Sequence, residues 1–192
     1  MRTVPVEGDF DLAIPEGFEK SRFMLWGSKG SAIPFVAPLN VDAEWVYNSS
    51  LKQDETAFNT IDEASSTVAY SFEMLDKGSK DSGIMIGNSD YLNTASSNYF
   101  ASGSIVLLFA NGTLSTRDAA EKKAIATYSV GERVKIKVEA NVQNGTYNVY
   151  VNGELKAEGV KFRQSADMLD TLALVENGGG AAFDVYNFRV IK

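Results

Sequence analysis

Residues 128–162 read YSVGERVKIKVEANVQNGTYNVYVNGELKAEGVKF, and apolar and polar residues alternate over much of this stretch. Val134, Ile136 and Val138 share one side of the first run, and charged residues occupy the positions between them. Residues 147–151 repeat the alternation. A period of two is typical of a β-strand with one buried face. The stretch therefore predicts strands that cover a core on one side and meet water on the other.

Two Asn-Gly pairs divide this stretch. Asn144-Gly145 separates the first two runs, and Asn152-Gly153 leads into a third run at residues 154–157. Asn-Gly readily adopts the positive φ angles that tight hairpin turns need. We therefore expect consecutive antiparallel strands joined by short turns, with a further hairpin at Asn111-Gly112.

The rest of the chain contains other short runs that are typical of strands. They occupy residues 22–26, 32–36, 45–47, 67–75, 83–87, 105–110, 113–117, 172–175 and 183–191. Residues 48–66 are polar and indicate a loop or a weak edge region, and for residues 118–126 we expect a loop or a single turn. Roughly ten short strands with turns between them predict an all-β fold, an antiparallel two-sheet β-sandwich of the jelly-roll type. Residues 1–192 are interpreted as one domain.

The composition argues against several functional classes. A net charge of −7 disfavours nucleic acid and anionic membrane surfaces as partners. The chain has no histidine, which removes the usual general base and every Ser-His-Asp scheme. It has no cysteine, so it forms no disulfide and carries no thiol nucleophile. No apolar run reaches the ~20 residues of a membrane helix, and none follows Met1, so we expect neither membrane insertion nor a signal peptide in this chain.

Three segments and the last strand resemble the motifs of a known family. Val68–Met74 is similar to its x-F-x-F strand, Tyr128–Val138 to Y-x-x-G-x-W-x-K-V-K-V, Thr146–Gly153 to T-Y-D-V-Y-V-D-G, and Tyr186–Val190 to D-N-I-x-V. On these motifs the chain resembles the concanavalin A-like lectin/glucanase (laminin-G-like) jelly rolls, in particular non-catalytic carbohydrate-binding modules of bacterial polysaccharide-processing proteins. The resemblance implies a polysaccharide ligand, an extracellular or cell-surface location, and other domains in a larger chain.

The chain departs from the family pattern at two positions. Arg133 stands where the family has Trp, and Tyr186 stands where it often has Asp; Asp184 lies two residues earlier on the same strand. In such modules that Asp and acidic residues near the N-terminus often hold a structural calcium ion (Ca²⁺). The resemblance therefore implies a calcium site at Glu7, Asp9 and Asp184, with Asp11 nearby, if the first and last strands are neighbours. The alternative is that the acidic residues near the N-terminus are solvated and bind no ion.

Aromatic residues in polar surroundings are the candidates for sugar binding, because sugars combine flat C–H faces with rings of hydroxyls. The predicted ligand-binding residues are Trp26, Trp45, Tyr47, Tyr91, Tyr99 and Asn93. The alternative is that the tryptophans belong to the core and the tyrosines cap the edge of the sandwich.

Catalysis is the weakest of three functional interpretations. The E-x-D-x-x-E strand of jelly-roll glucanases is absent, and Glu73 has no partner acid on its strand. A lyase site would need a tyrosine with a basic residue, and the strands offer Tyr147, Tyr150, Lys135 and Lys137. We expect a non-catalytic carbohydrate-binding domain without catalytic residues. A structural or adhesion module without a sugar site is the second interpretation, and a small lyase or hydrolase is the third.

Overall fold

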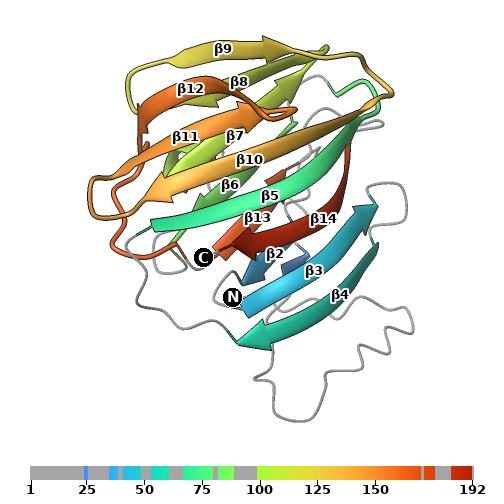
Figure 1. Ribbon diagram of the computed structural model, residues 1–192, viewed down its shortest axis with the longest axis horizontal. Coiled ribbons are helices and arrows are strands. Elements are labelled where there is room, and N and C mark those ends of the chain that lie inside the picture. Colours follow the sequence, from blue (N-terminus) through green and yellow to red (C-terminus); the bar gives the residue numbers. More distant parts are fainter. Residues whose placement is uncertain are drawn as a thin grey trace.

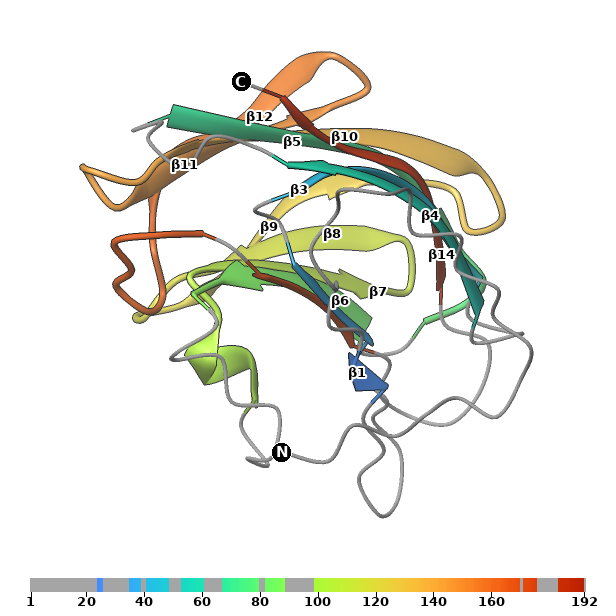
Figure 2. The same cartoon turned by 90° about the horizontal axis from the view of Figure 1, so that it is seen from below.

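The computed structural model describes residues 24–25, 35–38, 41–48, 53–60, 67–79, 82–88, 99–169, 171–175 and 183–191. These residues form two antiparallel β-sheets of seven strands each, stacked face to face (Figures 1 and 2). The predicted all-β two-sheet sandwich is confirmed.

The front sheet, which faces the viewer in Figure 1, has the strand order β12-β11-β10-β5-β14-β3-β4. Its strands are β12 (Glu154–Lys161), β11 (Thr146–Val151), β10 (Arg133–Asn141), β5 (Thr67–Asp76), β14 (Phe183–Ile191), β3 (Val41–Asn48) and β4 (Gln53–Thr60). The back sheet has the order β1-β2-β13-β6-β7-β8-β9. Its strands are β1 (Met24–Leu25), β2 (Phe35–Pro38), β13 (Thr171–Val175), β6 (Ser82–Gly87), β7 (Ile105–Ala110), β8 (Thr113–Arg117) and β9 (Lys122–Thr127). One short 3₁₀ helix, η1 (Tyr99–Ser102), precedes β7.

The core lies between the sheets and follows the predicted alternation. Val134, Ile136 and Val138 are at most 3% exposed, whereas Lys135 between them is exposed. The inward side chains of β5, β11 and β14 join those of β6, β7 and β13 in one apolar cluster. Phe109 and Phe183 meet across it with their ring centroids 5.4 Å apart. The alternation on β10 therefore sorts its side chains between core and surface as expected.

The central strands of the back sheet are buried on both faces. Val106 and Leu108 alternate with core residues of β7, yet they too are at most 2% exposed. A Cβ atom added at Gly103 would lie 3.0 Å from the Cβ of Met85, so the segment after η1 packs tightly on this second face. Burial on two faces explains why residues 105–110 form a continuous apolar run instead of alternating.

A buried carboxylate fixes the end of β5. Asp76 is fully buried; its Oδ1 accepts hydrogen bonds from the backbone N–H groups of Gly78 (2.9 Å) and Ser79 (2.6 Å). Its Oδ2 accepts one from the hydroxyl of Tyr128 at 2.6 Å. Burial, and then the carboxylate of Asp76, raise the pKa of Tyr128, so the phenol remains a donor. Asp76 thus ties β5 to the segment that precedes β10.

The structure corrects one predicted element and settles another. Residues 118–126 do not form only a loop, because β9 begins at Lys122 and pairs with β8. The loop is confined to a turn in which Asp118 accepts hydrogen bonds from the N–H groups of Ala120 and Glu121, both at 2.8 Å. β9 is an edge strand whose residues are exposed or half-buried, so its sequence lacks alternation. The sequence of the polar stretch at residues 48–66 indicates a loop or a weak edge region. The stretch contains the edge strand β4, so the second interpretation is confirmed.

Two of the three Asn-Gly turns have the predicted backbone. Asn111 and Gly112 have φ angles of 50° and 75°, and Asn152 and Gly153 have 51° and 84°. In the third pair only Gly145 has a positive φ, 62°. Residues 142–145 form a longer loop there, because Asn141 and Thr146 are the last residues to pair between β10 and β11. The predicted hairpin between β10 and β11 is therefore confirmed, with a four-residue turn in place of a tight Asn-Gly turn.

Candidate functional site on the outer face of the front sheet

Most residues predicted to bind a ligand lie outside the described residues. These are Trp26, Tyr91, Asn93, Glu7, Asp9 and Asp11. The backbone is described for three others, without their side chains: Trp45 and Tyr47 on β3, and Tyr99 in η1. The register pairs Trp45 with Phe188 and Tyr47 with Val185. The role of these residues in sugar binding stays a prediction.

Asp184, the described member of the predicted calcium site, is buried and forms an ion pair. It is 2% exposed, and its Oδ2 lies 2.8 Å from the ammonium of Lys77 and accepts a hydrogen bond from the hydroxyl of Tyr186 at 3.0 Å. Calcium needs six to eight oxygen ligands, typically at about 2.4 Å. Among the described residues no group of three or more acidic side chains gathers in a way that could hold a metal. Glu7 and Asp9 lie outside the described residues, so the calcium site at Glu7, Asp9 and Asp184 stays a prediction.

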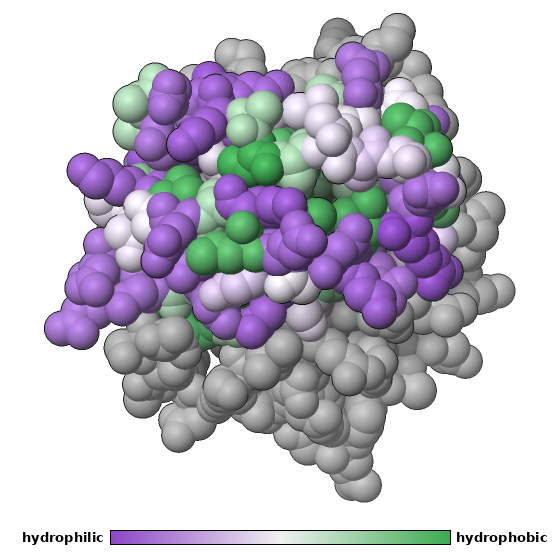
Figure 3. Space-filling model, turned by 45° about the horizontal axis from the view of Figure 1, so that its top comes forward, coloured by the Kyte–Doolittle hydropathy of each residue, from purple (hydrophilic) through white to green (hydrophobic). Residues whose placement is uncertain are grey.

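A shallow groove of about 410 Å³ crosses the outer face of the front sheet. It runs over β5 and β10 and reaches the turn between β11 and β12. Its lining residues are Ser71, Phe72, Glu73, Lys135, Ile136, Lys137 and Gly153. Phe72 and Ile136 are core residues, so the polar character of the groove comes from the outward residues of the two strands. Figure 3 shows hydrophilic residues dominating this side of the molecule, with small hydrophobic patches among them.

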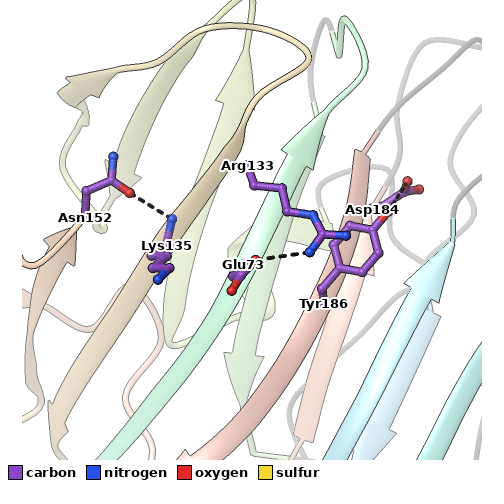
Figure 4. A network of polar contacts seen from close by, with 6 residues as sticks. All are labelled: Glu73, Arg133, Lys135, Asn152, Asp184 and Tyr186. Atoms are coloured by element: carbon purple, nitrogen blue, oxygen red, sulfur yellow. Dashed lines mark hydrogen bonds and ion pairs between the residues drawn. The ribbon is translucent and has the colours of Figure 1, made fainter.

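One flank of the groove is an ordered network on three strands. The guanidinium of Arg133 lies 3.9 Å from the ring centroid of Tyr186 and 3.4 Å from a carboxylate oxygen of Glu73 (Figure 4). Burial and the hydrogen bond to Asp184 raise the pKa of Tyr186. Arg133 and Tyr186 are the two departures from the family pattern, and they stack on each other. A cation over an aromatic face stabilises both groups by about 0.5–1 kcal/mol at an exposed site.

The other flank holds a tyrosine in a fixed orientation. The hydroxyl of Tyr150 on β11 donates to Glu139 at 2.9 Å, and the ammonium of Lys137 lies 2.7 Å from the other carboxylate oxygen of Glu139. The same ammonium lies 5.4 Å from the ring centroid of Tyr150. The hydrogen bonds from Lys137 and then Tyr150 hold the pKa of Glu139 below its usual value. Glu139 therefore remains an acceptor that orients the tyrosine ring.

Lys135 stands in the groove between these flanks. Its backbone N–H donates to the side-chain oxygen of Asn152 at 3.0 Å, which ties the strand to the β11–β12 turn. Within the described part of the chain, its ammonium forms no hydrogen bond or ion pair. Arg133, Lys135 and Lys137 alternate along β10, so three cations point to one face, and only the middle one lacks a carboxylate partner. Lys135 is available to a ligand.

The described residues at the groove do not bring two carboxylates close together. Glu73 is the carboxylate in the lining of the groove, and Glu139 beside it pairs with Ala69, four residues along β5 from Glu73. That separation is about 13 Å at the usual rise of a strand, beyond the roughly 5–10 Å that paired glycosidase acids need. Tyr147, considered above for a lyase, is 1% exposed in the core and faces away from the groove.

Comparisons with known proteins bear on the fold. No protein-family model matches the sequence, and no curated protein matches it. A sialidase matches the structure with a TM-score of 0.60 over 90% of this chain and 16% of its own, at 8% identity. Lectin II from Ulex europaeus matches with a TM-score of 0.51 over 88% of this chain and 86% of its own, at 10% identity. The fold is a concanavalin A-like jelly roll.

A third solved structure agrees with this assignment. The Trypanosoma rangeli sialidase, in complex with 2,3-difluoro-KDN, has a TM-score of 0.50 over 88% of this jelly roll and 29% of its own chain, at 12% identity. The jelly roll thus spans less than a third of the length of either sialidase. The family resemblance noted in the sequence is confirmed for the fold. Among the described residues no helix is long and apolar enough to cross a membrane.

Proposed function

We propose that this jelly roll is a non-catalytic carbohydrate-binding domain of an extracellular bacterial protein, and that the groove on the outer face of the front sheet binds polysaccharide. The observation that carries the proposal is a groove lined by Lys135, whose ammonium has no partner among the described residues, next to an oriented ring, Tyr150, which lies opposite the lining residue Lys137 in the register. The lectin fold of the Ulex protein supports a sugar ligand. The match to a small share of a sialidase supports a place in a larger chain.

The chemistry of the groove matches the two sides of a sugar ring. The apolar C–H face would stack on Tyr150, whose hydroxyl is already bound to Glu139 and whose ring is therefore ordered before a ligand arrives. Lys135 would donate to hydroxyl or carboxylate oxygens, and Ser71 adds a hydroxyl to the lining of the groove. A shallow, open groove suits a chain that continues past the site at both ends.

The first experiment is a glycan array combined with pull-down on insoluble polysaccharides, repeated with calcium and with a chelator. We expect one glycan class to be retained. Tyr150→Ala is expected to lower the affinity about tenfold and Lys135→Ala about threefold to tenfold, with no change in thermal unfolding. Lys156→Ala is the matched control for Lys135, because Lys156 is paired with Glu154 at 2.6 Å outside the groove. Binding that survives Tyr150→Ala and Lys135→Ala would place the sugar site elsewhere.

The aromatic residues predicted from the sequence provide the alternative arm of the same assay. Retention lost in Trp45→Ala or Tyr99→Ala, but kept in Tyr150→Ala, would favour a site formed around those residues. Loss of binding in the chelator would support calcium at Glu7, Asp9 and Asp184. A folded protein that binds no glycan would favour the structural or adhesion module, and release of shortened chains from a polysaccharide would favour a lyase or hydrolase.

Binding in the groove is expected to be constant between about pH 5 and 8. The pKa of Glu139 is lowered, so its carboxylate is fully ionised above its ordinary pKa of 4.5 and protonates only below that value. The hydrogen bond to Glu139 raises the pKa of Lys137, which keeps that ammonium charged throughout. The chain has no histidine to titrate in this window. Affinity measured by calorimetry across the range checks this, and a step near neutral pH would contradict it.

A further inference from the structure

Four cations gather at the open side of the sandwich, where β8 and β12 end. Arg117 is the last residue of β8, and Lys122 is the first of β9 and lies directly opposite it in the register. Lys161 ends β12, and Arg163 follows two residues later. β9 and β12 are the edge strands of the two sheets on the same side, and they contact each other (Figure 1). The cluster therefore joins both sheets.

The backbones that carry the two arginines are held firmly. The N–H of Arg163 donates to the carbonyl of Ser104 at 2.8 Å, and the N–H of Gln164 donates to that of Gly103 at 3.3 Å. Arg117 precedes the turn that Asp118 caps. Fixed backbones on both sides mean that little ordering is needed when a ligand binds.

The charges of this cluster are only partly balanced by the described residues. In that part of the chain, none of the four side chains forms an ion pair. Other cations do have partners: Lys77 with Asp184, Arg133 with Glu73, Lys137 with Glu139, and Lys156 with Glu154. Asp118, whose Oδ1 accepts from two backbone N–H groups of its own turn, lies near Lys161 and Arg163 and offsets one of the four positive charges.

The arrangement is electrostatically unfavourable without a counter-ion. Like charges directly opposite on paired strands, as in Arg117 and Lys122, are destabilising. Burial, and then the charge of Arg117, lower the pKa of Arg163. Exposed lysines commonly protect an edge strand from pairing with another chain, and this accounts for Lys122 and Lys161. It does not account for Arg117 and Arg163, which are partly buried and outside the edge strands themselves.

We propose that Arg117 and Arg163, flanked by Lys122 and Lys161, form a binding site for a tetrahedral oxyanion, a sulfate or phosphate group. A guanidinium group binds such an oxyanion with two parallel hydrogen bonds. Two arginines on fixed backbones supply the positive charge that balances the charge of the anion. The group is either a sulfate ester of a polysaccharide or a free ion. The site is separate from the groove over β5 and β10, and its residues take no part there.

Thermal unfolding in sodium sulfate tests the site itself. The change in Tm is measured in sodium sulfate relative to sodium chloride of the same ionic strength. Sulfate is expected to raise the Tm of the protein by about 3 °C more than that of the double variant Arg117→Gln/Arg163→Gln. General stabilisation by sulfate acts on both proteins and cancels in the difference. In low salt without sulfate, the double variant is expected to melt no lower than the unchanged protein, since a repulsion has been removed. Equal sulfate shifts in both proteins would overturn the proposal.

Binding to heparin, a sulfated polysaccharide, identifies the source of the anion. A net charge of −7 disfavours unspecific retention on a polyanion. If the ligand is a sulfate ester, the protein is retained and the double variant binds about tenfold more weakly. Lys123→Gln/Lys156→Gln is the charge-matched control, because both lysines are exposed and lie outside the groove and the four-residue cluster. Equal loss of retention in this control would show that heparin binding follows net charge and would overturn the polysaccharide arm. A sulfate shift without heparin binding would assign the site to the free ion.

Discussion

Replacing Asp76 with alanine is expected to lower the free energy of unfolding by about 4 kcal/mol, one of the two largest effects we expect of a single substitution. The side chain is fully buried and accepts hydrogen bonds from Gly78, Ser79 and Tyr128. Alanine would leave the Ser79 N–H and the Tyr128 hydroxyl without their acceptor in or near the core. A buried donor without an acceptor costs about 1–3 kcal/mol. Alanine would leave more than one such donor, and the small cavity that it creates would destabilise the protein further.

Urea unfolding followed by fluorescence measures this change. Tyr128→Phe removes one of the three hydrogen bonds and is expected to cost about 1–2 kcal/mol. Asp76→Asn keeps one acceptor oxygen and is expected to lie between the two. If Asp76→Ala unfolds at nearly the same urea concentration as Tyr128→Phe, the carboxylate does not anchor β5 in the way proposed here.

Gly83→Ala is expected to destabilise the protein by at least about 3 kcal/mol. Gly83 is on β6, between β13 and β7 in the back sheet. A Cβ atom there would lie 2.6 Å from the backbone oxygen of Leu107 and 2.8 Å from a ring carbon of Phe100. The ring has room to shift only if η1 moves, and the carbonyl belongs to the neighbouring strand, so pairing of β6 with β7 would be disturbed.

Gly159→Ala is the control for this substitution. Gly159 has a φ of +62°, but no atom lies within 4 Å of the position of its Cβ. Only the backbone strain of a left-handed residue remains, roughly 1–2 kcal/mol. Differential scanning calorimetry of both variants separates the steric effect from the conformational one. A Gly83→Ala variant that melts above Gly159→Ala would show that η1 and β7 adjust easily.

The sequence was sufficient for the fold because burial on one face leaves a readable pattern. Residues 133–151 alternate, and the structure buries Val134, Ile136, Val138, Tyr147, Val149 and Val151 as the pattern requires. Edge strands leave a weaker pattern. β9 has the sequence KKAIAT, and its residues are exposed or half-buried. Since neither face of this strand is buried, its sequence does not alternate, and the strand could not be predicted from local residues.

The site was harder to predict because its residues are distant in the chain. Glu73, Arg133 and Tyr186 come together only through the pairing of β5 with β10 and with β14. The signal was nevertheless present, since Arg133 and Tyr186 were the two departures from the family motifs. In the sequence, Tyr150, Lys135 and Lys137 stand out only as strand residues that a lyase site could use. The alternation already places Tyr147 on the buried side of its strand and Tyr150 on the outer side, but it does not indicate that Glu139 orients Tyr150.

The place of β14 in the front sheet also determines the order in which this sandwich can fold. β14 follows all other strands in the chain, yet it lies between β5 and β3. The β3–β4 hairpin is made early during synthesis but has no partner in the sheet until β14 has left the ribosome. Its open edge is meanwhile exposed to other chains, and contacts between such distant segments form slowly. Folding of this domain is therefore expected to be complete only after β14 has emerged and to depend on protection of the first hairpin.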